Sequence, residues 1–321
     1  MRSLKWGLIG CGDIAERRVA PALQVLESCD LVGINRARFE LAQPFADHFG
    51  ARKVFRHWQD LIADDEIEAA YIATPVYLHA EQAITAAHAG KHVLCEKPMA
   101  MSVEECDRMI EACKASRVHL GLAYYRHYYP AVHRIKQIVN SGELGRIVLI
   151  QISVLGYFDR QPGEPRHWLL VREQSGGGPM MDVGCHRIEV MLNIMGAVRR
   201  ITGRSANIRF QREVEDTSHA HFEFENGAHG LLTVTHASYE STDTLDIFGT
   251  KGSIHVPVLN DGDMRIITAE GERIEKHPQL PNVHLPLIED FTRSVLHDSP
   301  VTVDGSIGRE VNRIIAKIYN N

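Results

Sequence analysis

The apolar positions in the first 120 residues come in short runs, separated by longer stretches with helical spacing. Five runs of four to six residues lie at 6–10, 31–34, 69–74, 92–96 and 118–123. Helix-like periodicity fills intervals at 39–49, 78–89 and 103–115. Short apolar runs that alternate with helices are typical of buried parallel strands joined by helical crossovers. The pattern therefore predicts a doubly wound α/β sheet in this part of the chain.

The pattern changes after residue 122. A helix is expected at 130–141, and the glycines of NSGELGR end it. Alternation of apolar and polar positions then predicts antiparallel strands at 147–157, 200–210, 217–225, 228–238, 244–249 and 253–257. Further helices are expected at 179–195, 286–297 and 304–319. We therefore expect a Rossmann domain at 1–122 and an α+β domain with a mostly antiparallel sheet at 123–321.

Composition narrows the class of protein. The 321 residues are 44% hydrophobic and 24% charged, with a formal net charge of −6, so a basic stripe for nucleic acid or a membrane surface is not expected. No run approaches ~18 apolar residues, and MRSLKWGLIG is too glycine-rich for a signal peptide. Six cysteines without CxxC pairs suggest free thiols in a reducing cytoplasm. His219 and His221 alternate on an expected strand and are expected on its surface.

The first apolar run leads into the glycine-rich turn GLIGCGDIA, which places Gly10, Gly12 and Ala15 between an expected strand and an expected helix. Glycines there allow a tight turn and let the backbone approach a pyrophosphate, whose charge then meets the helix N-terminus. A tight turn without a ligand is the alternative. Because strand, turn and helix follow in the order that binding requires, we expect a dinucleotide at this turn.

The end of the second expected strand, GINRARFE, bears on which dinucleotide binds. An acidic residue at this point accepts hydrogen bonds from the adenine ribose in NAD-binding proteins. This chain has Asn35, Arg36 and Arg38 there, and the first carboxylate is Glu40. Guanidinium groups suit a 2′-phosphate, so we expect NADP, with NAD as the alternative cofactor. The arginines would otherwise be solvated surface charges.

The fourth apolar run ends in CEKPMA, at Glu96, Lys97 and Pro98. Ligands of open α/β sheets bind outside the carboxyl ends of the strands, and Thr74 and Pro75 follow another such end. An amine delivered there can contact a substrate hydroxyl. Pro98 would fix the direction of the lysine, and a cis peptide is one means of doing so. The alternative is a surface lysine in a turn.

A second cluster lies in SGGGPMMDVGCHRIEVMLNIMG. Three glycines and Pro179 lead into a helix, on which Asp182, His186 and Glu189 recur at i, i+4 and i+7 and so share one face. A histidine held near a carboxylate is suited to exchanging a proton with a carbinol oxygen. A metal site is one alternative, although one histidine with carboxylates on a single helix is an incomplete ligand set, and we expect none. A purely structural helix face is the other.

Together these motifs resemble the Gfo/Idh/MocA oxidoreductase family, which includes glucose–fructose oxidoreductase and inositol dehydrogenase. The matching stretches are GLIGCGDIA, ATPVYLHAEQAITAAHAGKHVLCEKPMA and GGGPMMDVGCHRIEVMLNIMG, and the resemblance covers nearly the whole chain. It implies a Rossmann domain followed by an open-faced sheet domain, with the substrate in the cleft between them. It also implies a homodimer or homotetramer that assembles through the exposed face of the C-terminal sheet.

The resemblance also implies roles for individual residues. Lys97 matches the catalytic lysine of the family's EKP motif, and Asp182 and His186 match its DxGxH element. His186 would be the main acid or base and Lys97 would polarise the reacting oxygen, or the two would share these roles. Expected cofactor contacts are Gly10, Gly12, Asp13, Ile14, Asn35, Arg36, Arg38, Thr74, Pro75, His79, Glu96 and Lys97. Expected substrate contacts are Tyr125, Arg126, Trp168, Asp182 and His186.

Two features depart from the family pattern. Glu189 stands where many relatives have an aspartate, and its longer side chain would reposition the site. The segments AYYRHYYP and RHWLL are rich in aromatic residues. Aromatic faces often stack on sugar rings, which is why Tyr125, Arg126 and Trp168 are among the expected substrate contacts. Packing between domains is the alternative role for these three.

The sequence thus predicts reversible hydride transfer between a nicotinamide cofactor and a secondary alcohol or ketone of a sugar, polyol or similar small molecule. One alternative is a redox-neutral enzyme that retains its dinucleotide, oxidises a sugar transiently, eliminates a group and reduces the product again. The other is a non-catalytic, dinucleotide-binding regulator. The presence of Lys97, Asp182 and His186 disfavours the regulator, and the substrate itself is not specified by the sequence.

Overall fold

The computed structural model describes residues 2–320, which divide into two compact units. The first contains the residues up to Tyr125 together with Pro281–Asn312, and the second contains Arg126–Leu280 and the residues from Arg313 onward. The sequence placed 281–312 in the second domain, so the structure differs from that expectation. Within the described residues, no helix is both long and apolar enough to cross a membrane.

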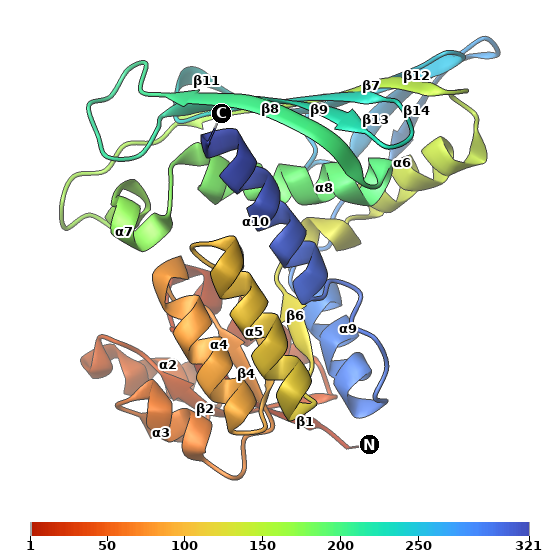
Figure 1. The fold of residues 1–321 in the computed structure, drawn as a ribbon. Coiled ribbons are helices and arrows are strands. Elements are labelled where there is room, and N and C mark those ends of the chain that lie inside the picture. The colour runs from red at the N-terminus through yellow and green to blue at the C-terminus, as the bar shows by residue number, and fades with distance from the viewer. Residues whose placement is uncertain (1, 321) are drawn as a thin grey trace. The chain divides into compact units, whose positions relative to one another are not determined.

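The first unit is built on a parallel sheet whose strand order is β3-β2-β1-β4-β5-β6, the arrangement of a Rossmann fold (Figure 1). Its strands are β1 (Leu4–Ile9), β2 (Cys29–Asn35), β3 (Lys53–Phe55), β4 (Ala69–Ile72), β5 (His92–Cys95) and β6 (Leu120–Leu122). Five of them confirm the predicted apolar runs. The sequence missed β3, because three partly buried residues give no recognisable run.

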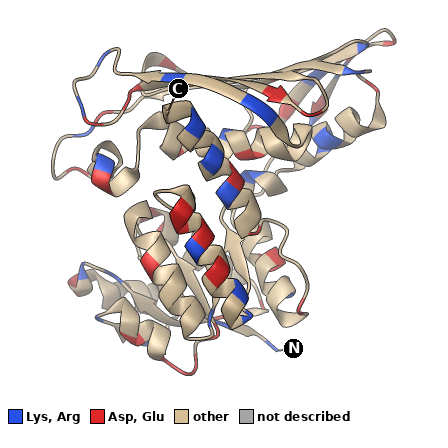
Figure 2. Ribbon diagram, viewed as in Figure 1, with Lys and Arg blue, Asp and Glu red and all other residues tan. Residues whose placement is uncertain are grey.

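Helices surround this sheet. They are η1 (Ala15–Val19), α1 (Ala20–Val25), η2 (Phe39–Leu41), α2 (Ala42–Phe49), α3 (Trp58–Ala63), η3 (Val76–Leu78), α4 (His79–His88), α5 (Val103–Ser116) and α9 (Leu285–Leu296). The start of α5 shows how the sequence fixes a helix end. The Ser102 hydroxyl accepts a hydrogen bond from the Glu105 backbone N–H at 3.2 Å, and the Glu105 carboxylate accepts one from the Met101 N–H at 3.0 Å. Acidic and basic residues both lie along the α5 ribbon, and acidic ones predominate in its first turns (Figure 2).

The segment Pro281–Asn312 joins the first unit because α9 fills a space beside β1. The Phe291 ring lies 5.5 Å from the Trp6 ring, measured between centroids, and both side chains are fully buried. Gly121 makes room for Phe291, since a Cβ at this glycine would stand 2.6 Å from the phenylalanine ring. The Thr292 hydroxyl also meets the Cys29 thiol at 3.3 Å. Apolar burial of this kind is what holds the C-terminal segment to the first unit.

The second unit contains a mixed sheet with strand order β14-β13-β12-β11-β7-β10-β9-β8 (Figure 1). Its strands are β7 (Ile147–Tyr157), β8 (Val198–Ala206), β9 (Thr217–Phe224), β10 (His229–Thr235), β11 (Ala237–Gly249), β12 (Gly252–Val256), β13 (Asp263–Thr268) and β14 (Gly271–Lys276). Strand β10 pairs in parallel with β7, and the other neighbours are antiparallel. The expected mostly antiparallel sheet is confirmed, and β13 and β14 extend it beyond the prediction.

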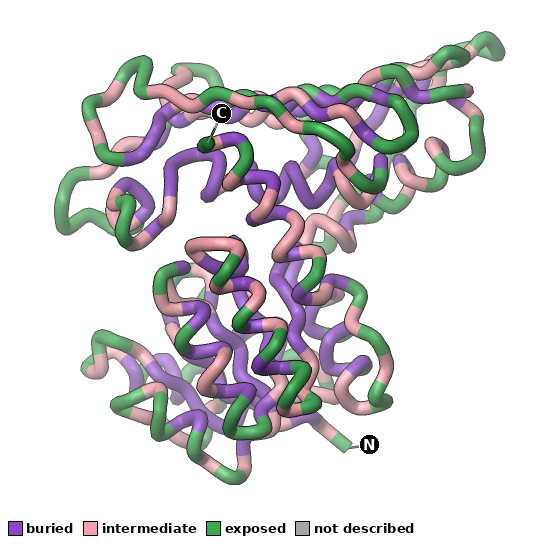
Figure 3. Tube along the Cα trace, in the orientation of Figure 1, coloured by how far each residue is buried: buried purple, intermediate pink, exposed green. Residues whose placement is uncertain are grey.

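One face of this sheet packs on helices and the other carries exposed side chains. Along β9, buried Ser218, Ala220, Phe222 and Phe224 alternate with more exposed residues. Buried and exposed positions are mixed along the chain of this sheet (Figure 3). The helical elements of this unit are η4 (Tyr125–Tyr128), α6 (Pro130–Ser141), η5 (His167–Leu170), α7 (Arg172–Ser175), η6 (Met180–Gly184), α8 (Cys185–Met195) and the end of α10 (Gly305–Tyr319). The predicted 179–195 helix is therefore a π-helical turn followed by an α-helix.

Candidate active site

The glycine-rich turn after β1 has the geometry that its sequence predicts. Gly10 adopts a φ of +90°, and a Cβ there would stand 2.8 Å from the carbonyl group of Ala73. Gly12 faces open space, because a Cβ at this position would meet no atom within 4 Å. Helical backbone begins at Asp13, and Ile14 precedes the π-helical turn η1. The exposed turn and helix N-terminus therefore fit a dinucleotide pyrophosphate.

The end of β2 combines a structural amide with arginines. Asn35 is only 7% exposed, and its side-chain amide donates to the carbonyl oxygens of Phe55 and Arg56 at 3.0 and 3.1 Å. Asn35 thus ties β2 to the end of β3, although the sequence placed it among the cofactor contacts. Arg36 donates to the Leu41 carbonyl at 3.3 Å and is only partly buried. Arg38 is exposed, so two guanidinium groups follow β2 without a carboxylate between them.

His79 lies behind the ends of β4 and β5 and is 1% exposed. One ring nitrogen, Nε2, is 2.8 Å from the Thr74 carbonyl oxygen, and the other, Nδ1, is 3.0 Å from that of Pro98. Burial lowers the pKa of His79, although these carbonyl contacts oppose the shift. Because both nitrogens face the backbone, His79 supports the two loops from inside, whereas the sequence placed it among the cofactor contacts.

Lys97 follows a carboxylate that is fixed inside the first unit. Glu96 is 6% exposed, and its Oε1 accepts hydrogen bonds from the Tyr71 hydroxyl at 3.0 Å and from His284 Nε2 at 3.2 Å. Burial raises the pKa of Glu96, but His284, Lys97 and Tyr71 outweigh it and leave the pKa below its ordinary value. The Lys97–Pro98 peptide is cis, as the sequence suggested. Lys97 itself is half-buried, so its backbone is anchored beside an ionised carboxylate.

In the second unit, a buried carboxylate caps the helix that follows the glycine run. Glu215 accepts hydrogen bonds from the Gly178 N–H at 2.8 Å and the Met180 N–H at 3.2 Å. The Tyr319 hydroxyl donates to the same carboxylate at 2.8 Å. Gly178 must be glycine, because a Cβ there would stand 2.0 Å from the Glu215 carbonyl oxygen. A carboxylate at a helix N-terminus satisfies free N–H groups and is favoured by the helix dipole.

Asp182 and His186 follow this cap by one and two turns. Asp182 lies in the π-helical turn η6, where its Oδ2 is 3.5 Å from Arg166 Nη2 and 3.6 Å from His236 Nε2. His186 lies in the first turn of α8 and is 4% exposed. The local backbone thus presents a carboxylate and an imidazole from successive turns of one continuous helical segment.

Glu189, the third residue of the predicted helix face, contacts a histidine of another helical element. Its Oε1 is 2.6 Å from Nδ1 of His127, and the carboxyl group is 1% exposed. Burial raises the pKa of Glu189, although the contact with His127 opposes the shift. Glu189 therefore joins α8 to η4 through a short polar contact.

Tyr125, Arg126 and Trp168, which the sequence places at the substrate, each make a packing contact within their own unit. In the first unit, the Tyr125 ring lies 4.8 Å from the His284 ring. In the second, the Arg126 guanidinium lies 5.9 Å from the Tyr129 ring centroid. Trp168 packs on a buried apolar cluster formed by Phe158, Leu169, Leu170 and Val214. Across residues 2–320, no group of three or more His, Cys, Asp or Glu side chains is arranged to hold a metal ion.

Known protein families match both units. A model of an oxidoreductase family with an NAD-binding Rossmann fold matches residues 4–124, and one of the GFO/IDH/MocA C-terminal domain matches residues 132–255. Oxidoreductase P35 of Formosa agariphila is 32% identical over 253 residues, which is 78% of each chain. This chain belongs to the Gfo/Idh/MocA oxidoreductase family. The resemblance seen in the sequence is thereby confirmed.

The names of two relatives bear on the chemistry of the Gfo/Idh/MocA family. The D-xylose 1-dehydrogenase [NADP(+)] of Haloarcula marismortui is 26% identical, over 98% of this chain and 90% of the relative. A solved structure of levoglucosan dehydrogenase in complex with NADH and levoglucosan superposes with a TM-score of 0.90 at 26% identity, covering 99% of this chain and 96% of that one. The chain is therefore an oxidoreductase whose named relatives include sugar dehydrogenases.

Three residues near the family motifs were not singled out in the sequence. They are His284, which contacts Glu96, Glu215, which caps the helix before Asp182, and His236, which faces Asp182. Each is separated by at least 35 positions from the residues that it contacts here. No local motif marks such a residue, because its role depends on which segments the fold brings together.

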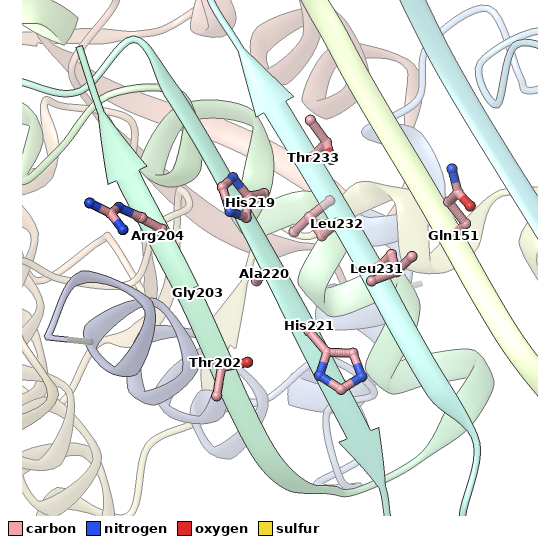
Figure 4. A pocket seen from close by; sticks show the side chains of 10 residues that line it. All are labelled: Gln151, Thr202, Gly203, Arg204, His219, Ala220, His221, Leu231, Leu232 and Thr233. Atoms are coloured by element: carbon pink, nitrogen blue, oxygen red, sulfur yellow. The ribbon is translucent and has the colours of Figure 1, made fainter. Parts of the chain in front are cut away.

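The Gfo/Idh/MocA sheet domain also has a shallow hollow of about 390 Å³ on its exposed face, seen from close by in Figure 4. His219 and His221 lie there on β9, as the sequence predicted for surface residues. His221 Nε2 is 2.7 Å from Nδ1 of His229 on β10. The lining residues are Gln151, Thr202, Gly203, Arg204, His219, Ala220, His221, Leu231, Leu232 and Thr233.

Proposed function

We propose that the protein catalyses reversible hydride transfer between NADP(H) and a secondary alcohol or ketone of a sugar, polyol or similar small molecule. One observation carries the proposal. Strands β1, β4 and β5 are neighbours in a parallel sheet, so the turn at Gly10, the Thr74–Pro75 step and Lys97 all follow the same edge. Ligands of such sheets bind outside that edge. A dinucleotide at the glycine turn and the amine of Lys97 would therefore serve one site.

The residues of the family motifs have distinct roles in this proposal. When bound, the nicotinamide ring supplies the hydride chemistry. Lys97 would bind and polarise the reacting oxygen, and His186 would exchange its proton. Asp182 would orient these groups and balance their charge. The glycine turn and the N–H groups from Asp13 onward would hold the pyrophosphate.

The experiment that tests these roles compares Lys97→Met and His186→Gln with the wild-type protein. Turnover should fall by roughly 10²–10⁴-fold in each variant, because each lacks a positioned acid, base or donor. Cofactor binding, followed by nicotinamide fluorescence, should remain within a few fold. Near-full turnover in both variants with cofactor bound would refute the assigned roles. A count of cofactor consumed per product would separate net dehydrogenation from a redox-neutral reaction.

We propose NADP as the preferred cofactor because Arg36 and Arg38 follow β2 and the first carboxylate after the strand is Glu40. The protein, stripped of bound nucleotide, should bind NADPH more tightly than NADH. Arg36→Gln should weaken NADPH binding while leaving NADH binding unchanged, since only the former carries the 2′-phosphate. Arg146, an exposed arginine of the second unit, provides the matched control as Arg146→Gln. Preference of the wild type for NADH would refute the NADP proposal but not the hydride-transfer proposal.

We propose a homodimer or homotetramer that forms through the exposed face of the C-terminal sheet. Supporting this, β10 exposes Leu231 and β11 exposes Phe248 on that face, where exposed apolar side chains favour association. Light scattering after gel filtration should give a mass of two or four chains, and Leu231→Glu should lower it. A single-chain mass for the wild type at micromolar concentration would contradict the proposal.

A further inference from the structure

His236 is held rigidly where β10 passes into β11. Its backbone N–H donates to the Asp216 carbonyl at 2.8 Å, and its own carbonyl accepts a hydrogen bond from the Phe158 N–H at 2.9 Å. The side chain is 7% exposed, and its ring lies 5.0 Å from the Phe158 ring. Backbone and ring are therefore both fixed, so the direction of each ring nitrogen is defined.

The surroundings of His236 determine which nitrogen carries the proton. Nδ1 lies 3.3 Å from Nη2 of Arg212. An arginine guanidinium is always protonated and can only donate, so Nδ1 must be the accepting nitrogen. The hydrogen of the neutral ring is consequently on Nε2. Nε2 faces the Oδ2 atom of Asp182 at 3.6 Å.

Arg212 is itself held by the backbone. Its Nη1 donates to the Phe158 carbonyl at 3.1 Å, and its Nη2 donates to the Glu215 carbonyl at 3.1 Å. Its guanidinium also stacks 5.0 Å from the Phe210 ring. These contacts leave Nη2 little freedom to turn away from His236. A chain of contacts thus runs from the β8–β9 loop through Arg212 and His236 to Asp182.

We propose that His236 is a positioning residue that orients the Asp182 carboxylate through its Nε2–H. The same Oδ2 atom of Asp182 also lies 3.5 Å from Nη2 of Arg166, whose side chain is 50% exposed. The buried imidazole therefore provides the fixed contact and the exposed guanidinium the adjustable one. This inference rests on the proposed function, in which Asp182 acts beside His186. A second layer of this kind restricts a reactive carboxylate to one productive orientation.

Two substitutions separate the role of each ring nitrogen. His236→Gln keeps an N–H near the position of Nε2, whereas His236→Asn keeps a polar atom near Nδ1 but removes the N–H that faces Asp182. We expect kcat to fall roughly 10–100-fold in His236→Asn, because a misplaced group costs about that much, and to recover to within about threefold of wild type in His236→Gln. The KM for substrate and the Kd for NADPH should stay within about twofold in both.

His88→Asn is the matched control, since this exposed histidine ends α4 and lies in neither the sheet nor any proposed site. It should leave kcat unchanged, and thermal unfolding of all variants would show that they are folded. If His236→Asn and His236→Gln lose activity equally, or neither loses any, the positioning role is refuted.

A measurement without turnover tests the same contact. In the wild-type protein with NADPH bound, the ¹⁵N resonances of His236 should show Nδ1 unprotonated and Nε2 protonated. The carboxyl ¹³C resonance of Asp182 should move in His236→Asn and stay in place in His236→Gln. A proton on Nδ1 would overturn the inference even if the enzyme is active. Absence of turnover on every sugar and polyol tried, with these spectra as expected, would count against the proposed function alone.

Discussion

Gly10 and Gly12 stand two positions apart but meet different surroundings. Gly10 has a φ of +90° and packs against the Ala73 carbonyl, whereas Gly12 faces open space. Gly10→Ala should therefore destabilise the protein by roughly 1–3 kcal/mol, through backbone strain and crowding. Gly12→Ala should leave stability within about 0.5 kcal/mol and should instead weaken NADPH binding. Urea unfolding measures the stability of both variants, and fluorescence titration measures their affinity for NADPH. Equal destabilisation by Gly10→Ala and Gly12→Ala would contradict the prediction.

The buried Glu96 makes the free energy of unfolding depend on pH in the acid range. Its folded pKa lies below the ordinary value of 4.5, so the charged form is favoured by folding. The resulting stabilisation is present above pH 4.5 and is lost as the pH falls through the lower, folded pKa. Glu96→Gln should be less stable at pH 7 by roughly 1–3 kcal/mol and should lose less stability between pH 7 and pH 3.

Urea unfolding at several pH values tests this, with Glu225→Gln as the control for an exposed carboxylate. An equally steep loss of stability in Glu96→Gln and wild type below pH 4.5 would show that another group is responsible.

Candidate site residues can be named from the sequence only where a motif marks them. Local patterns place Lys97 at a strand end, and Asp182 and His186 on one helix face. His284 contacts Glu96 from 188 positions away, and His236 reaches Asp182 through a strand junction. Nothing in the nearby sequence distinguishes either from the other histidines. Their roles follow from tertiary contacts that a single sequence does not encode locally.

Strands and helices were predictable in proportion to their periodicity. The expected segments 130–141 and 147–157 coincide with α6 and β7. The sequence did not predict strands β13 and β14. In β14, four of the six residues are charged, so its alternation of apolar and polar positions is weak. The π-helical turns η1 and η6 have no distinct signal, since the residues that form them would also suit an α-helix.

The cap on the helix segment that carries Asp182 can be tested directly. Glu215→Ala should lower the free energy of unfolding by roughly 2–4 kcal/mol, because it leaves buried N–H groups without an acceptor. Tyr319→Phe should cost only about 1 kcal/mol, since one neutral hydrogen bond is lost. Chemical denaturation measures both, and the exposed Glu225→Ala serves as control. If Tyr319→Phe proved as damaging as Glu215→Ala, the capping role would be wrong.

The sequence predicted two domains but not the return of the chain to the first unit at Pro281–Asn312. Helical periodicity predicted both C-terminal helices but not the unit to which each belongs. The first unit includes Pro281–Asn312, and the second unit includes the residues from Arg313 onward. That assignment depends on which apolar surfaces fit each other, such as Phe291 against Trp6. A pattern of apolar positions shows that a face is buried, but not what buries it.

Removing the residues after Asn312 should therefore damage the second unit. Ile318 is 1% exposed and packs against Gly203, and Tyr319 contacts Glu215. Their loss should destabilise this unit by at least roughly 3 kcal/mol. Scanning calorimetry should show the change, and a chain that ends after Tyr319 should melt close to wild type. Unchanged melting of the shorter chain would contradict the proposed anchoring.

The return of the chain to its first unit has a consequence during synthesis. A ribosome must make residues 126–280 before it reaches the segment that contains α9. At 5–20 residues per second this takes roughly 10–30 s. Throughout that interval the nascent Rossmann sheet lacks Phe291, and the apolar surface around Trp6 stays uncovered. The nascent chain must therefore avoid aggregation during this interval. We expect a chaperone that covers apolar surface to bind it.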